Sequence, residues 1–73
     1  MALIDVKTDI TGSVWKIVAK VGDKVAEDEP ILILESMKME IPVSTPEDGV
    51  VAEILTTEGA TVTEGMVLAR IAV

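Results

Sequence analysis

Residues 41–51, IPVSTPEDGVV, repeat the pattern of residues 4–14, IDVKTDITGSV, at an offset of 37 positions. The same offset pairs the whole of residues 1–36 with residues 38–73 without a gap. Self-similarity at a fixed offset indicates duplicated architecture, and paired glycines strengthen this interpretation because glycine marks backbone geometry. The identical pairs are Ile4/Ile41, Val6/Val43, Thr8/Thr45, Gly12/Gly49, Val14/Val51, Ile17/Ile54, Gly22/Gly59, Val25/Val62 and Glu27/Glu64.

Each half contains short aliphatic runs that are rich in β-branched residues and separated by turn residues, which is typical of strands. No segment of ten or more residues has a convincing helical period. The sequence therefore predicts an all-β fold: a flattened β-barrel or sandwich of two quasi-symmetric four-stranded halves, related by a pseudo-twofold axis. The predicted strands are Leu3–Lys7, Ser13–Lys20, Lys24–Val25 and Pro30–Glu35 in the first half, and Met39–Ser44, Val50–Thr56, Thr61–Val62 and Val67–Ala72 in the second.

The size and composition of the chain indicate one small domain with an aliphatic core. A chain of 73 residues holds one domain, which we expect to span residues 1–73. Hydrophobic residues make up 49% of it, and Trp15 is the only aromatic residue. We expect Trp15 to be a packing residue rather than a binding site. A sheltered barrel of this kind gives little reason to expect a tight oligomer, so a monomer is predicted.

The charge and the missing residue types exclude several classes of function. A formal net charge of −7 makes nucleic acid and anionic membrane surfaces poor partners. The chain has no cysteine and no histidine, so it lacks thiol chemistry and the commonest general base and metal ligand. No apolar run is longer than that of Ile31–Leu34, which is too short to span a bilayer. Since no signal peptide is recognisable, we expect a cytoplasmic location.

The junction of the two halves falls at Met37-Lys38, because Ser36 aligns with Val73 and Lys38 aligns with Met1. A twofold relation would place this junction and the chain ends at opposite ends of the domain. A two-residue hairpin turn there normally requires Asn-Gly or Asp-Gly, since both residues need positive φ. Met-Lys is a poor choice on local propensity, and such departures cluster at functional sites. The repeat thus predicts an exposed hairpin that carries Lys38.

The residues around this junction resemble the attachment motif of biotinyl domains, in which a lysine is flanked by methionines. The resemblance covers the chain from about Val6 to its end. The chain is similar both to free-standing biotin/lipoyl attachment proteins and to biotin carboxyl carrier domains of acyl-CoA carboxylases. Lipoyl domains share the fold but usually have Asp-Lys-Ala at this place. The residues that carry the resemblance are Glu35-Ser36-Met37-Lys38-Met39-Glu40, together with Gly12–Lys16, Val21–Val25 and Glu40–Val43.

The resemblance implies a role for each residue of the motif. Lys38 matches the lysine that a biotin protein ligase acylates with biotin from biotinyl-adenylate. Met37 and Met39 match the flanking methionines that matter for recognition by the ligase and by carboxylase active sites, and Glu35 and Ser36 complete the motif. The biotin would carry carboxylate between biotin carboxylase and carboxyltransferase sites, so the chain itself would be non-catalytic. The remaining matches, which the resemblance identifies as turn glycines, are Gly12, Gly22, Gly49 and Gly59.

Three other functions are open on the sequence. A lipoyl carrier, or a dual biotin/lipoyl acceptor, would serve an oxoacid dehydrogenase or a glycine-cleavage system, with lipoate in place of biotin. An unmodified β module would keep Lys38 free, as a solubilising residue of an edge hairpin. An autonomous enzyme is the least favoured, since the sequence has no nucleophile–base constellation, metal cluster or phosphate-binding glycine loop. Glu35 and Glu40 resemble an acid–base pair, but no pocket-forming length of chain surrounds them. One departure from the family is Asp28, where glycine is common; aspartate tolerates left-handed geometry, so we expect the turn to survive.

Overall fold

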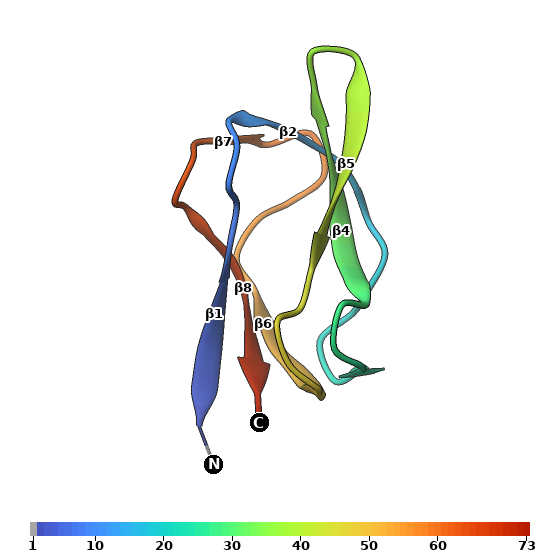
Figure 1. Cartoon of the computed structure of the whole chain (residues 1–73), viewed down its shortest axis with the longest axis vertical. Helices are drawn as coiled ribbons and strands as arrows, with labels where there is room; N and C mark the ends of the chain where they lie inside the picture. The colour runs from blue at the N-terminus through green and yellow to red at the C-terminus, as the bar shows by residue number, and fades with distance from the viewer. Residues whose placement is uncertain (1) are drawn as a thin grey trace.

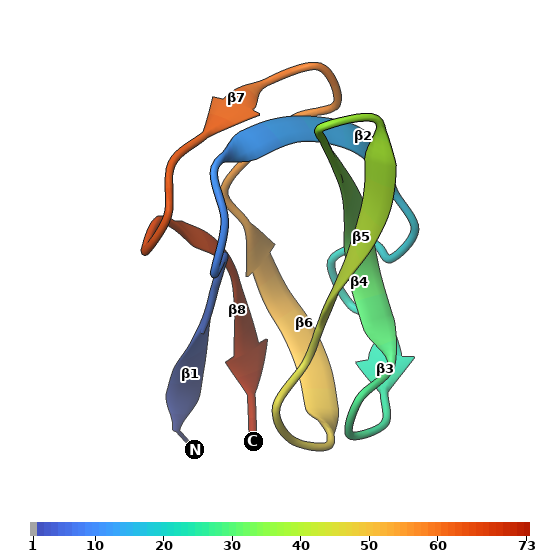
Figure 2. The same ribbon diagram turned by 45° about the horizontal axis from the view of Figure 1, so that its top comes forward.

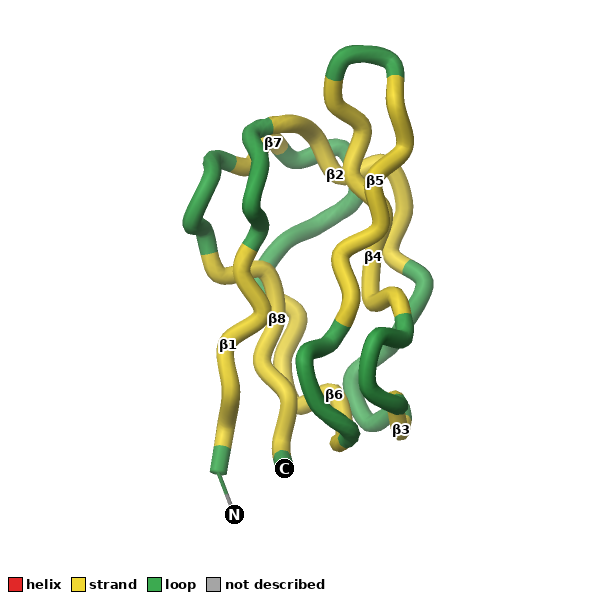
Figure 3. Tube along the Cα trace, in the orientation of Figure 1, coloured by secondary structure: helices red, strands yellow, loops and turns green. Residues whose placement is uncertain are grey.

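A computed structural model of the chain describes residues 2–73 and shows eight β-strands and no helix in that part of the chain (Figures 1 and 3). Both halves supply four strands, three of them five to seven residues long and one of only two residues, as the repeat predicts. The strands are β1 (Leu3–Lys7), β2 (Gly12–Ile17), β3 (Lys24–Val25), β4 (Pro30–Ser36), β5 (Met39–Ser44), β6 (Gly49–Ile54), β7 (Thr61–Val62) and β8 (Val67–Ala72).

The strands form two four-stranded antiparallel sheets that enclose one core (Figure 2). One sheet, here sheet A, has the order β1-β8-β6-β3, and the other, sheet B, has the order β5-β4-β2-β7. The domain is elongated, with extents of 36 × 18 × 18 Å. The flattened sandwich predicted from the sequence is therefore confirmed. Neither sheet corresponds to one half of the chain, because each takes two strands from each half.

The pseudo-twofold axis exchanges the two sheets and holds to the level of individual residue pairs. In sheet A, Ile4 lies opposite Ile71; the offset of 37 converts this pair into Ile41 opposite Leu34 in sheet B. The long ladders even carry their register shifts at equivalent places. Two copies of one pairing scheme therefore interlock to make the domain.

The register shift in β2 changes the path that the sequence predicts for this strand. Trp15 is the extra residue of the bulge between Val14 and Lys16. Its side chain is 50% exposed, so Trp15 is not the packing residue that the sequence predicted. The strand ends at Ile17 instead of Lys20, and β6 correspondingly ends at Ile54 instead of Thr56. The amides of residues 18 and 19 both donate to the same carbonyl, that of residue 31, at 3.0 and 3.1 Å, which ends the regular ladder.

The core consists of aliphatic side chains that face inward from both sheets, and burial of each valine, leucine or isoleucine side chain stabilises the fold by about 1.5–3 kcal/mol. Two threonines, Thr8 and Thr45, are also buried at symmetric positions. Each hydroxyl donates to the carbonyl two residues further on, at 2.7 Å, so neither oxygen is left without a partner. The buried apolar residues are Val6, Val14, Ala19, Val25, Ile31, Leu32, Leu34, Val43, Val51, Val62, Leu68, Ala69 and Ile71.

The turn that contains Asp28 has the conformation of its glycine counterpart. Asp28 has a φ of 68°, and Gly65, at the equivalent position, has a φ of 86°. The amide of Asp28 donates to the carbonyl of Thr45 at 2.9 Å, just as the amide of Gly65 donates to that of Thr8 at 2.8 Å. The expectation that aspartate preserves this turn is confirmed. Within residues 2–73, no helix is long and apolar enough to cross a membrane.

Candidate functional site

The candidate site is the hairpin formed by β4 and β5, whose two-residue turn is Met37-Lys38. Ser36 pairs with Met39 across the hairpin, and the two turn residues have φ values of 52° and 65°. Positive φ at both positions is the requirement of a type I′ turn, which suits the twist of the adjoining strands. A left-handed conformation costs a residue other than glycine about 1–2 kcal/mol. The predicted conflict between local propensity and backbone geometry is therefore present.

The tip of the hairpin projects beyond the rest of sheet B (Figure 1). The ladder between β2 and β4 ends at the pair Ser13–Glu35, so the residues after Glu35 have β5 as their only strand partner in the described part of the chain. The side chain of Met37 is 88% exposed and that of Met39 is 57% exposed, and Lys38 between them is exposed as well. Strand β1 begins and strand β8 ends at the opposite end of the domain (Figure 1), as the repeat predicts. The amine of Lys38 is thus presented outward and not enclosed.

Directly beside its turn, the hairpin is hydrogen-bonded to the segment that precedes β2. The hydroxyl of Ser36 donates to the carbonyl of Thr11 at 3.1 Å. At Gly12, a Cβ atom would lie 2.6 Å from the carbonyl oxygen of Glu35, which is closer than side chains normally approach. Gly12 is therefore a close-contact residue at the start of a strand, and Gly49 is its equivalent beside Ala72; neither is the turn glycine that the sequence suggested.

The other two glycines of that set do lie in turns, because Gly22 and Gly59 have positive φ. Sequence reasoning missed the contact between Ser36 and Thr11. The signal that could have found it is weak: Thr11 precedes the paired glycine Gly12, but only the fold places this segment beside the hairpin.

Two exposed carboxylates lie on the strands that carry the turn. Glu35 and Glu40 occupy directly opposite positions in the ladder between β4 and β5. Like charges in this arrangement repel each other, and the ammonium of Lys38 lies between them in the sequence. Both side chains are open to water, so the pair does not form an enclosed acid–base site.

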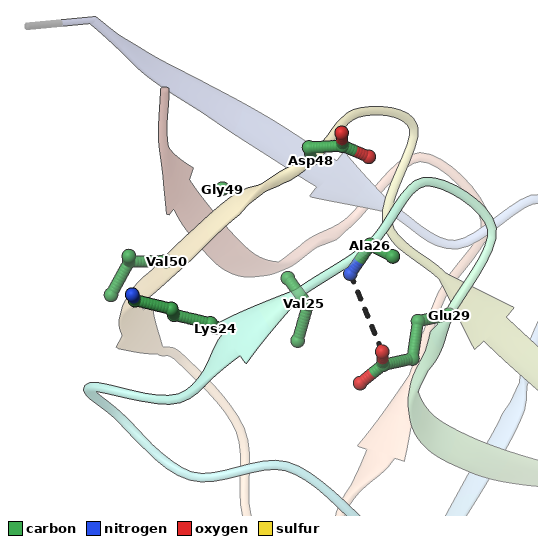
Figure 4. Close-up of a pocket in the computed structure, with 7 residues that line it drawn as sticks. All are labelled: Lys24, Val25, Ala26, Glu29, Asp48, Gly49 and Val50. Carbon is green, nitrogen blue, oxygen red and sulfur yellow. Dashed lines mark hydrogen bonds between the residues drawn. The ribbon is translucent and has the colours of Figure 1, made fainter.

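Three hollows on the surface lie away from the turn. One of them, of about 480 Å³, is lined by residues 24–26, 29 and 48–50 (Figure 4). There the carboxylate of Glu29 accepts a hydrogen bond from the amide of Ala26 at 3.3 Å. None of the three hollows is lined by residues 35–40. Among residues 2–73, no group of three or more acidic, histidine or cysteine side chains is arranged to hold a metal ion.

The sequence profile of the family described as "Biotin-requiring enzyme", the biotin/lipoyl family, matches residues 4–71. The chain belongs to this family. The resemblance predicted from the lysine–methionine motif is therefore confirmed, and it extends over nearly the whole domain. The Lys38 hairpin is the feature of the biotin/lipoyl fold that projects furthest in this chain.

Proteins of this family that resemble the chain differ greatly in length. The "Biotin/lipoyl attachment protein" of Bacillus subtilis strain 168 is 43% identical over 63 residues, which cover 86% of each chain. The crystal structure of the Kluyveromyces lactis urea carboxylase matches with a TM-score of 0.94 and 35% identity, over 99% of this chain but only 6% of that one. The lipoyl domain of the 2-oxoglutarate dehydrogenase complex from Azotobacter vinelandii matches with a TM-score of 0.77 and 35% identity, over 94% of this chain and 95% of that one.

Proposed function

We propose that Lys38 is the site of covalent biotin attachment and that the chain acts as a biotin carboxyl carrier. The observation that carries this proposal is the position of Lys38 at the tip of a projecting, strained two-residue turn, between two exposed methionines. Relatives whose names refer to biotin attachment and to biotin carboxyl carrier proteins support the choice of cofactor.

Attachment would be an acyl transfer to the side-chain amine. The neutral amine of Lys38 attacks the acyl carbon of biotinyl-adenylate; the bond from that carbon to the phosphate oxygen breaks, AMP leaves, and an amide forms. Lysine amines are mostly protonated at neutral pH, so the ligase must remove a proton and orient the amine. The product lacks the positive charge of Lys38, which changes the formal net charge from −7 to −8.

The biotinylated chain would shuttle between two catalytic partners. Biotin accepts carboxylate at a biotin carboxylase and gives it to an acceptor at a carboxyltransferase, while the carrier supplies only placement. The exposed hairpin suits this role, because a monomeric carrier must insert the same lysine into more than one active site. We place these events in the cytoplasm. The carboxyltransferase, and not this chain, would select the substrate that accepts the carboxylate.

A lipoyl carrier is the second candidate, and two comparisons favour it. The domain superposes on a lipoyl domain over 94% of its length, and the name of the Bacillus subtilis relative includes both cofactors. The same amine of Lys38 would form an amide with lipoate. The methionines on both sides of Lys38 favour biotin.

Intact mass spectrometry after co-expression with a biotin protein ligase tests the proposal. We expect one biotin adduct on the parent chain and none on Lys38→Arg, which keeps the positive charge but lacks the acceptor amine. Lys20→Arg, which changes another exposed lysine, is the matched control and should keep the adduct. An unmodified parent with an intact fold would contradict biotin attachment, and a lipoate ligase would then test the second candidate. Failure with both ligases would leave the unmodified β module.

A further inference from the structure

Among residues 2–73, the methionines differ strongly in exposure, and the two most exposed flank Lys38. The side chains of Met37 and Met39 are 88% and 57% exposed, whereas that of Met66, in the turn before β8, is 42% exposed. Met37 lies in the two-residue turn itself, at a φ of 52°. The thioethers of the hairpin are thus the sulfur atoms most open to solvent among residues 2–73.

Exposed thioethers react with peroxides. The sulfur attacks one oxygen of hydrogen peroxide, the O–O bond breaks, and methionine sulfoxide and water form; sulfur loses two electrons and the peroxide gains them. The product replaces a flexible apolar group with a polar, chiral one, and sulfoxide reductases reverse the reaction with electrons from thiols. Susceptibility follows access to the oxidant, so we expect Met37 to react first, Met39 next and Met66 last.

We propose that Met37 and Met39 form an oxidation-sensitive site that controls the modification of Lys38, with hydrogen peroxide as the oxidant. This inference rests on the proposed function, in which an enzyme must enclose the turn to reach the amine. Any such enzyme buries the two flanking side chains, and burial of a polar sulfoxide without a hydrogen-bond partner is unfavourable. Reduced methionine favours that contact, because it is apolar and adapts its shape.

The effect of oxidation would act through contact and not through charge. A sulfoxide has no net charge, so Glu35, Lys38 and Glu40 keep their formal charges. The side chains of Met37 and Met39 lie outside the buried core, so their oxidation leaves the packing between the sheets in place. A loss of reactivity at Lys38 after oxidation would therefore report on recognition of the turn.

The experiment measures the initial rate of biotin attachment to the full chain before and after titration with hydrogen peroxide. Peptide mapping identifies the order in which the methionines gain oxygen, and circular dichroism checks the fold. We expect the rate to fall at least tenfold once Met37 and Met39 are oxidised. Treatment with methionine sulfoxide reductases should restore the rate.

Matched variants separate the hairpin from the rest of the chain. Met66→Leu should keep the full sensitivity to peroxide. The double variant Met37→Leu/Met39→Leu should have the same rate with and without peroxide, whatever its starting rate. The inference is overturned by an oxidised hairpin that reacts at the unchanged rate, or by persistent sensitivity of the double leucine variant. If the untreated chain accepts no biotin, the proposed function falls and this inference falls with it.

Discussion

The two ends of the domain are built on the same ladder but close it differently. At one end, Ser36 and Met39 are joined by Met37-Lys38; at the other, Ala2 and Val73 occupy the equivalent positions, and the chain begins and ends there. Ala2 and Val73 still exchange backbone hydrogen bonds at 3.3 and 2.9 Å. This pairing of strand ends therefore forms without a turn that joins the two strands. The two ends of the domain differ in the turn Met37-Lys38, which contains the candidate acceptor.

The outer faces of the two sheets also differ from each other at equivalent positions. On sheet A, Arg70 forms ion pairs with Asp5 at 3.1 Å and with Glu53 at 3.4 Å. The offset of 37 places Ile33, Pro42 and Lys16 at the corresponding sites of sheet B. The buried faces are nearly interchangeable, because both must fill one core, whereas the outer faces are free to diverge.

Deletion of symmetric core side chains should give the largest effect. Leu34 and Ile71 are equivalent and fully buried. We expect Leu34→Ala and Ile71→Ala each to lower the free energy of unfolding by about 2–5 kcal/mol, through lost transfer energy and a cavity. Urea denaturation followed by circular dichroism measures this. Costs that differ by more than twofold would mean that the core is less symmetric than its ladders.

Addition of a methyl group at the paired glycines compares how firmly the two ends are held. At Gly12 the new Cβ would lie 2.6 Å from the carbonyl of Glu35, and at Gly49 it would lie 2.4 Å from that of Ala72. We expect Gly12→Ala to cost about 1–3 kcal/mol. Gly49→Ala should cost more, since its Cβ would also lie 2.6 Å from Cγ2 of Ile71, a fully buried core side chain. Thermal unfolding of both variants measures the difference, and a smaller cost for Gly49→Ala would show that the last residues of β8 can move aside.

Relief of the strained turn should stabilise the fold and abolish the acceptor. The double variant Met37→Asn/Lys38→Gly supplies the residues that a type I′ turn favours. We expect a gain of about 1 kcal/mol, because left-handed residues other than glycine cost about 1–2 kcal/mol each. Chemical denaturation measures the gain. Met37→Asn alone serves as the control that retains the amine. An unchanged or lower stability would show that the turn is not strained.

Removal of the ion pairs of sheet A should have the smallest effect. Arg70→Ile places in sheet A the residue that sheet B has at the equivalent position. The side chains of Arg70, Asp5 and Glu53 are 38%, 44% and 43% exposed, and exposed pairs contribute about 0–1 kcal/mol. We expect a change below about 1 kcal/mol in urea denaturation, and a smaller change in high salt. A loss above 2 kcal/mol would show that these charges hold sheet A together.

The sequence predicted the strands and the hairpin because the repeat and the turn residues are local signals. It did not predict which strands pair: β1 lies beside β8, and no local pattern encodes a contact between the two ends of the chain. The end of strand β2 was predicted three residues too late, because alternation of side chains does not reveal a bulge at Trp15. The exposure of Trp15 follows from that same bulge.

The candidate site was more predictable than the contacts that support it. Lys38 and its neighbours are contiguous, so the motif identified all of them at once. Thr11 supports Ser36 from 25 positions away, and the role of Gly12 depends on the closeness of another strand. Such contacts arise only when β2 and β4 are placed side by side, and composition cannot report them.

The closeness of Ala2 and Val73 makes this domain suitable for insertion into other polypeptides. Ala2 and Val73 are hydrogen-bonded partners, and β1 begins and β8 ends at the end of the long axis away from the hairpin of β4 and β5 (Figure 1). A domain whose ends lie together tolerates transfer into another polypeptide, because both links leave from one place. The same fold accordingly makes up 86% of one small bacterial relative and 6% of a yeast urea carboxylase chain. In this chain, links through Ala2 and Val73 would leave the domain at the end away from the hairpin that carries Lys38.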